Sequence, residues 1–340
     1  MNHRGFTAVG VALLLYVFAM VAWVPLGPGL VEVMADEQGQ TQVIAHGTHF
    51  ASSPDQLRIF AGTQDRLFPL AFEVVNDHRL LLRPEWPDTL HKRSLDLYVQ
   101  SPIDGTLSLG NAFFVENAVL VPAHRYASVD VLDGSNQLGF HFPFQPQIFE
   151  TIRNLMLHVP MWFTMFFLMG ISFAQSIRHL GAKTLGLADE RAVTSAQTGL
   201  FFGIIGLVTG SLWARFTWGD WWVASDPQLN GALVTVLVYA GYLVLRAAVD
   251  DPVLRARISA VFNLFAFVLL IILLMIFPRF NESLHPGKGG NPGFNTYDLD
   301  SSLRAVFYPA VIGWILLGMG MYRLRLRMES LSRRINRLEP

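Results

Sequence analysis

A tryptophan-rich segment carries the residue types most directly suited to binding chemistry. It reads Thr217-Trp218-Gly219-Asp220-Trp221-Trp222-Val223-Ala224-Ser225-Asp226 and lies between two long apolar runs. Tryptophan is frequent at membrane–water boundaries because its ring is apolar while its N–H needs a hydrogen-bond partner. Three tryptophans within five residues exceed an ordinary boundary belt, so they predict an aromatic surface for a flat apolar ligand.

Two histidines stand at the ends of other apolar runs, and we expect them on the same side of the membrane as these tryptophans. His158 is in the sequence Leu157-His158-Val159-Pro160, and His285 follows Ser283-Leu284. An ionisable side chain at that depth is a functional-site candidate, although it can also bind a lipid headgroup or a backbone carbonyl. Neutral imidazole is a common axial ligand of haem iron. Two imidazoles on opposite faces of a porphyrin, from His158 and His285 as metal ligands, would make a six-coordinate haem site.

Charged residues near the same boundary have two interpretations each. Arg153, Arg215 and Arg279 could pair with haem propionates or extend toward lipid headgroups. Asp220 and Asp226 could orient the ligands or the tryptophan N–H groups. Asp226 directly before Pro227 equally suits the cap of a helix.

The other eight histidines are expected in surface or structural roles. They are His3, His46, His49, His78, His91, His124, His141 and His179. His46 and His49 are close enough to suggest a metal site, but no third ligand accompanies them in sequence. The chain contains no cysteine, which excludes disulfides, thiolate metal sites and covalent haem attachment to this chain. It also contains no hydrolase or phosphate-loop motif.

Composition indicates a membrane protein. Hydrophobic residues make up 52% of the 340 residues and charged residues 15%, whereas a soluble domain carries about 25% charge. Six apolar stretches are long enough to cross a bilayer as helices. They are Phe6–Leu26, Leu155–Ile177, Ala196–Trp213, Leu229–Val249, Ile258–Phe277 and Ala305–Tyr322. The net charge of −1 gives no indication of a nucleic-acid partner.

Basic residues are concentrated on one side of these six spans. That side holds Arg4, Arg178, Lys183, Arg191, Arg246, Arg255, Arg257 and six arginines after Tyr322. The positive-inside rule therefore predicts both termini in the cytoplasm and the tryptophan segment outside.

The region from 29 to 149 differs in kind, because it alternates apolar and polar residues. The alternating runs include Leu57–Phe60, Ser94–Val99 and Ser128–Leu132, and turn signals stand at Asp104-Gly105, Leu109–Asn111 and Asp133–Ser135. Short alternating runs with regular turns predict a β-sandwich or barrel. The expected fold is thus an all-α membrane protein of six transmembrane helices, with an extracytoplasmic β-sandwich-like domain inserted between helices 1 and 2.

Together these features resemble the haem exporter protein C family, the CcmC/CcsA-type WWD-domain proteins of bacterial cytochrome c biogenesis. The family pattern has six spans, a tryptophan-rich outer loop between the third and fourth, and one outer histidine on each flank. The resemblance covers the first helix and residues 150–327. Within the loop, Ser225 and Gln228 replace a tryptophan and an arginine common in the family, which is similar to a CcsA-labelled branch.

The resemblance implies transient, non-covalent haem b held by His158 and His285, with contacts from Trp218, Gly219, Trp221, Trp222 and Asp226. It implies delivery of that haem to a periplasmic chaperone of the CcmE type, with an ABC-type CcmAB complex, a small CcmD-type subunit and membrane lipid as partners. Such a protein is an assembly and transport factor of the bacterial inner membrane, not an enzyme.

On this basis the chain divides into four expected parts. These are a transmembrane helix (1–28), a periplasmic β-rich insertion (29–149), a five-helix haem-handling domain (150–327) and a cytoplasmic basic tail (328–340). The insertion could dock the chaperone or the apocytochrome, or it could serve as a lid or stability module.

Two other functions stay open on the residues alone. A membrane electron carrier would keep bis-histidine haem permanently, although carriers usually bury it between helices and both histidines here lie at helix ends. A receptor or transporter would bind a solute through the β-rich region and would need no haem.

Overall fold

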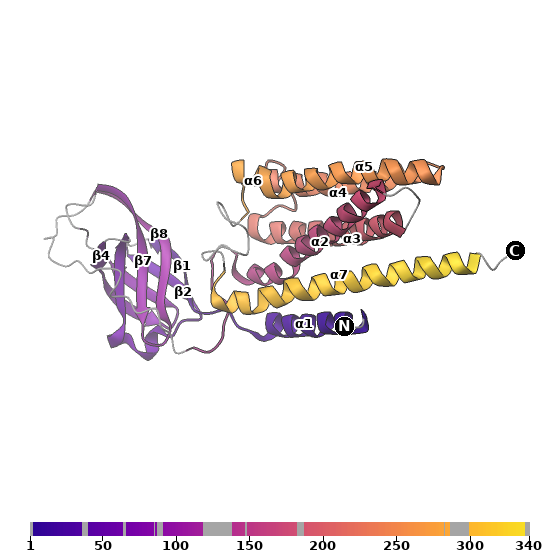
Figure 1. Ribbon diagram of the computed structural model, residues 1–340. Coiled ribbons are helices and arrows are strands. Elements are labelled where there is room, and N and C mark those ends of the chain that lie inside the picture. The colour runs from indigo at the N-terminus through magenta and orange to yellow at the C-terminus, as the bar shows by residue number, and fades with distance from the viewer. Residues whose placement is uncertain are drawn as a thin grey trace. The chain divides into compact units, whose positions relative to one another are not determined.

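The structure is a computed structural model that describes residues 3–35, 40–63, 66–84, 86, 91–117, 138–146, 148–181, 187–281, 283–285 and 299–336. The chain forms two compact units. A helical unit contains residues 1–23 and 151–340, and a β unit contains residues 24–150 (Figure 1).

The helical unit confirms the six predicted spans. Among the described residues, six helical segments are long and apolar enough to cross a membrane. They are α1 (His3–Trp23), α2 (Leu155–Gly181), α3 (Leu187–Trp218), α4 (Pro227–Ala247), α5 (Pro252–Ile271) with its continuation, and α7 (Ser301–Asn336). The π-helical turn η5 (Ile272–Ile276) and the short α6 (Phe277–Phe280) continue α5. Because α7 extends to Asn336, residues 328–336 of the expected tail prolong the last helix.

Glycines on one face of α3 set its distance from α2. A Cβ built on any of four of them would come within 3.1 Å of an α2 side chain. They are Gly199, Gly203, Gly206 and Gly210, facing Met169, Met165, Trp162 and His158 respectively. Small residues allow this close approach between membrane helices, where packing supplies most of the attraction. The glycine face therefore brings α2, with His158, directly against α3.

Other contacts hold the remaining helices of this unit. Helix α1 runs beside α7 (Figure 1), and a Cβ on Gly10 of α1 would lie 2.9 Å from the Leu316 Cβ. At the start of α3, both carboxylate oxygens of Asp189 accept hydrogen bonds from Arg246 of α4, at 2.7 and 2.9 Å. Such bidentate pairs are the stronger kind of ion pair, so α3 and α4 are joined at the end opposite the tryptophan segment.

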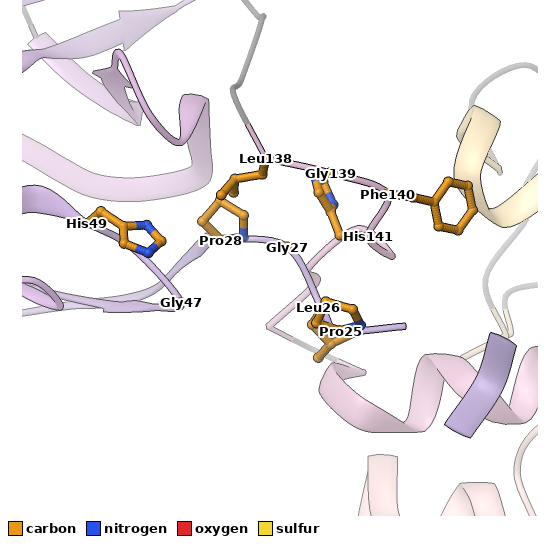
Figure 2. A pocket seen from close by; sticks show the side chains of 10 residues that line it. All are labelled: Pro25, Leu26, Gly27, Pro28, Gly47, His49, Leu138, Gly139, Phe140 and His141. Carbon is orange, nitrogen blue, oxygen red and sulfur yellow. The ribbon is translucent and has the colours of Figure 1, made fainter. Parts of the chain in front are cut away.

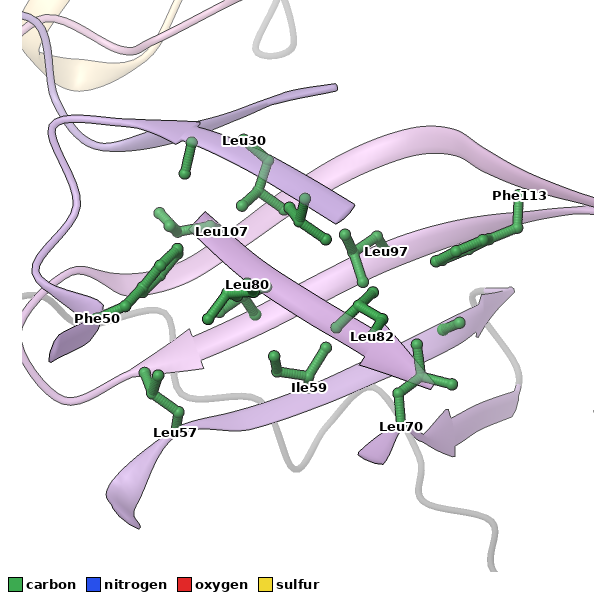
Figure 3. Close-up of a cluster of buried hydrophobic side chains, with 14 of the residues drawn as sticks. Leu30, Phe50, Leu57, Ile59, Leu70, Leu80, Leu82, Leu97, Leu107 and Phe113 are labelled. Atoms are coloured by element: carbon green, nitrogen blue, oxygen red, sulfur yellow. The ribbon is translucent and has the colours of Figure 1, made fainter. Parts of the chain in front are cut away.

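The β unit is built from two four-stranded antiparallel sheets, which confirms the predicted β-sandwich. The first has the order β1 (Gly29–Ala35), β2 (Thr41–His46), β6 (Arg79–Arg83), β5 (Ala71–Asn76). The second has the order β4 (Arg66–Pro69), β3 (Arg58–Thr63), β7 (His91–Ser101), β8 (Gly105–Asn117). Leucines of both sheets, including Leu80 and Leu97, meet in one buried core (Figure 3).

Of the turns predicted in this unit, the one at Asp104-Gly105 is confirmed and the one at Leu109–Asn111 is not. Gly105 has φ +78° and begins β8 directly after β7, as the Asp104-Gly105 signal predicts. The turn predicted at Leu109–Asn111 is wrong, because β8 continues through it with an irregular register against β7. Asn111 takes φ +54° there and donates its N–H to Asp96. The run Ser128–Leu132 and the signal Asp133–Ser135 lie outside the described residues.

Candidate functional site

His158 lies near the start of α2, with its ring against the backbone of Gly210 on α3. Its Nδ1 is 3.1 Å from the Thr209 hydroxyl oxygen. That hydroxyl donates its own proton to the carbonyls of Ile205 and Gly206, at 2.9 and 3.2 Å. It can therefore only accept from His158, so Nδ1 carries the ring proton and Nε2 keeps a free electron pair. Thr209 thus selects the tautomer that a metal ligand needs.

His285 lies after the end of α6, beside two tryptophans. Its ring centroid is 5.2 Å from that of Trp218 and 5.9 Å from that of Trp213, and these two tryptophans are in edge contact at 4.9 Å. His158 contacts Thr209 and Gly210, and His285 contacts Trp213 about one turn further along α3. The two histidines expected to act together therefore lie beside the same end of α3, with Trp218 beside His285.

The Asp226 carboxylate joins the tryptophan segment to the segment that carries His285. Its Oδ1 accepts the N–H groups of Gln228 and Leu229 at 3.0 Å each, and so caps α4. Its Oδ2 accepts the Ser283 hydroxyl and the Leu284 N–H, both at 2.8 Å. The predicted helix cap is confirmed, and the same side chain also fixes the residues directly before His285.

Asp226 further faces the ring of His285. The His285 Nδ1 is buried and lies 3.6 Å from Asp226 Oδ1, an ion-pair contact that is too long for a hydrogen bond. Burial by itself would raise the pKa of Asp226, but the N–H groups of Leu229 and Leu284 and the other donors hold that pKa below its ordinary value. Burial lowers the pKa of His285, and the nearby carboxylate only partly opposes this. Both shifts favour an ionised Asp226 facing a neutral imidazole.

Hydrogen bonds with residues of α3 and α4 hold the rest of the tryptophan segment in place. Gly219 has φ +87°, a conformation that favours glycine, and its carbonyl accepts a hydrogen bond from Arg215. The Trp221 carbonyl accepts the Ser211 hydroxyl, while the Trp221 side chain is 57% exposed. The Trp222 N–H donates to the Asn230 side chain at 3.4 Å.

The three tryptophans of this segment therefore have different surroundings. Trp218 meets His285, Trp221 is open to the surface, and Trp222 is tied to the start of α4. Two of the arginines considered for propionates donate to backbone carbonyls, Arg153 to Val21 and Arg215 to Gly219.

Four residues that the sequence did not single out complete the site. They are Thr209 and Gly210 beside His158, Trp213 beside His285, and Ser283 on Asp226. The sequence does contain a signal for Gly210, because Gly199, Gly203, Gly206 and Gly210 recur at helical spacing. Among the described residues, no group of three histidine, aspartate or glutamate side chains could hold a metal ion.

Thr209→Val should weaken the haem binding that the resemblance implies for His158 about tenfold, the lower end of the usual effect of removing a partner that orients a metal ligand. Valine keeps the shape of threonine but cannot accept the His158 Nδ1 proton. Thr235→Val is the matched control, because Thr235 is buried and donates to Gly231 four residues back without contacting a histidine. Haem titrations of the two detergent-purified variants compare them. Equal affinities would contradict the orienting role of Thr209.

Comparison with known proteins gives one consistent result. The family model described as heme exporter protein C matches residues 107–339. This range omits the first helix, which the resemblance in sequence had included. The chain is similar to heme exporter protein C of Bradyrhizobium diazoefficiens, with 32% identity over 56% of this chain and 70% of the relative. The relatives in Escherichia coli K12 (30%) and Paracoccus denitrificans (29%) cover 61% and 58% of this chain and 82% and 80% of their own lengths. This chain therefore belongs to the heme exporter protein C family.

Proposed function

We propose that the chain holds haem b non-covalently between His158 and His285 and delivers it to a periplasmic haem chaperone during cytochrome c maturation. The observation that carries this proposal is that both histidines lie beside the same end of α3, His158 at Thr209 and His285 at Trp213. Thr209 holds the Nδ1 side of His158, and Asp226 faces the Nδ1 side of His285. His158 can therefore offer Nε2 to iron, and the neutral ring of His285 also carries one nitrogen with a free electron pair.

The residues present fit haem in two respects. Haem iron offers two axial positions, which suits two neutral imidazoles. The rings of Trp213 and Trp218 supply apolar surface beside His285, and Trp221 supplies exposed apolar surface in the same segment. Trp222, Gly219 and Asp226 shape that segment rather than offering further iron ligands.

Delivery to another protein is supported by the kinship and by where the site lies. The relatives are named heme exporters, and a protein that passes haem on needs it near a surface. His158 is at the start of a span and His285 follows the end of another. We infer an inner-membrane protein with cytoplasmic termini and the site facing the periplasm. Its partners would be a CcmE-type chaperone, a CcmAB-type ABC complex and a CcmD-type subunit.

An absorption spectrum of the detergent-purified protein, oxidised and reduced, with pyridine extraction to quantify haem, tests the proposal. We expect substoichiometric b-type haem in the parent, and its loss or a spectral change in both His158→Ala and His285→Ala. His179→Ala is the matched control, because His179 belongs to the last turn of α2, at the opposite end from His158. Haem indifferent to both histidines, or equally reduced in all three variants, would contradict the site.

A further inference from the structure

A cavity of about 280 Å³ lies within the β unit, to which neither His158 nor His285 belongs. It is lined by the segments Pro25–Pro28 and Leu138–His141, together with Gly47 and His49 (Figure 2). These two segments are joined by backbone hydrogen bonds, from Gly27 N–H to the Phe142 carbonyl at 2.7 Å and from Phe142 N–H to the Pro25 carbonyl at 2.9 Å. Backbone hydrogen bonds therefore hold the two lining segments of the cavity together.

His49 presents an oriented imidazole to this cavity. Its Nδ1 is 2.8 Å from Oδ1 of Asp104, whose side chain is fully buried. The Asp104 Oδ2 accepts the His49 backbone N–H and the Ser101 hydroxyl, both at 3.0 Å. Nδ1 is placed to donate to Asp104, and a neutral imidazole that does so carries no proton on Nε2. Nε2 then keeps its electron pair, and the side chain is 45% exposed.

A histidine held in this way by a carboxylate is the usual arrangement of a metal-binding imidazole. The sequence predicts only a surface or structural role for His49, because Asp104 is 55 residues away in the chain. Asp104 accepts three hydrogen bonds, two of them from His49, so the buried carboxylate fixes the orientation of the His49 ring beside the cavity.

The surroundings favour a metal centre that brings most of its own ligands. A free zinc ion needs three or four protein ligands, and no such group exists among the described residues. A metalloporphyrin supplies four nitrogens itself and needs one axial imidazole and apolar surface. Pro25, Leu26, Pro28, Leu138 and Phe140 supply that surface. Since ligand pockets usually exceed about 300 Å³, this cavity would admit one edge of the macrocycle and leave the rest exposed.

We propose that His49 is the axial ligand of a second, partly exposed metalloporphyrin site in the β unit. The electron pair of Nε2 forms one coordination bond to the metal and replaces a water ligand there. The open cavity makes this binding reversible, which suits a holding position for haem outside the helical unit. The inference stands on the cavity and on the His49–Asp104 pair, so it does not depend on the site at His158 and His285.

The test is a haemin titration of the full chain carrying His158→Ala and His285→Ala, which removes the site in the helical unit. We expect one equivalent of haemin with the Soret shift of imidazole ligation, absent from empty micelles. His49→Ala should weaken binding at least tenfold. Gly139→Phe should do the same while keeping the His49–Asp104 pair intact, because a Cβ on Gly139 has no atom within 4 Å and the residue lines the cavity.

His78→Ala is the control, because it removes an exposed histidine of the same unit that does not line the cavity. A zinc titration runs in parallel. Haemin binding that survives both His49→Ala and Gly139→Phe, or that falls equally with His78→Ala, would overturn the proposal. So would zinc binding that needs His49 without any haemin binding. Failure of this site would leave the proposed function untouched, since the parent protein tests that function through His158 and His285.

Discussion

Asp226→Asn should lower the affinity for haem by roughly tenfold or more, although Asp226 need not touch the ligand. The carboxylate accepts four hydrogen bonds, two from the first turn of α4 and two from Ser283 and Leu284. An asparagine that keeps the cap must turn its NH₂ group toward the Leu284 N–H, which leaves that donor without an acceptor. Such a loss costs about 1–3 kcal/mol, and about 1.4 kcal/mol corresponds to a tenfold change in affinity. The lost hydrogen bond destabilises the segment that positions His285, and the affinity for haem falls with it.

The matched control for this prediction is Asp251→Asn. Asp251 caps α5 through the Leu254 N–H, so its substitution weakens a helix cap without reaching the histidines. Haem titration and thermal unfolding of both variants separate positioning from stability. We expect Asp226→Asn to lose affinity beyond any loss of stability that the two variants share. Ser283→Ala should give an intermediate loss, because it removes only one of the two hydrogen bonds on Oδ2. Parent-like affinity in Asp226→Asn would show that the His285 segment keeps its place without the carboxylate.

Local patterns in the sequence were sufficient to predict the spans and the sandwich, and they also named His158 and His285 as candidate ligands. Apolar runs of about 20 residues identify helices by length, and period-two alternation identifies strands such as β7. The error at Leu109–Asn111 has a local cause. Glycine and asparagine favour a turn and a bulge alike, because both need positive φ. Only the pairing of β8 with β7 decides between the two.

The partners of the histidines depend on contacts between distant parts of the chain. Thr209 meets His158 only because α2 and α3 pack in one particular register, 51 residues apart in sequence. Asp226 reaches Ser283 across 57 residues. The capping role of Asp226 was visible from Pro227 beside it, whereas its hold on the His285 segment was not. Spacing within one helix gave a usable signal only for Gly210, through the glycine face of α3.

Gly210→Ala is the second substitution with a large expected effect. An added Cβ would lie 2.6 Å from Cε1 of His158, closer than real contacts allow, so the imidazole must move or α2 must shift away from α3. Either movement displaces the proposed iron ligand from its hydrogen bond with Thr209. We expect at least a tenfold loss of haem affinity. Alanine is about 1 kcal/mol more favourable than glycine in a helix, which offsets part of the packing cost.

Gly241→Ala is the matched control for Gly210→Ala. Gly241 is a helical glycine in α4, and a Cβ there meets no atom within 4 Å. The two variants add the same methyl group to a membrane helix, but only one of them meets a histidine. Haem affinity should therefore fall in Gly210→Ala and stay at the parent level in Gly241→Ala. If Gly210→Ala bound haem as the parent does, His158 would tolerate displacement, and the iron ligand would have to be sought elsewhere. A loss in Gly210→Ala that disappears with Gly210→Ser would contradict the steric argument as well, since serine also carries a Cβ.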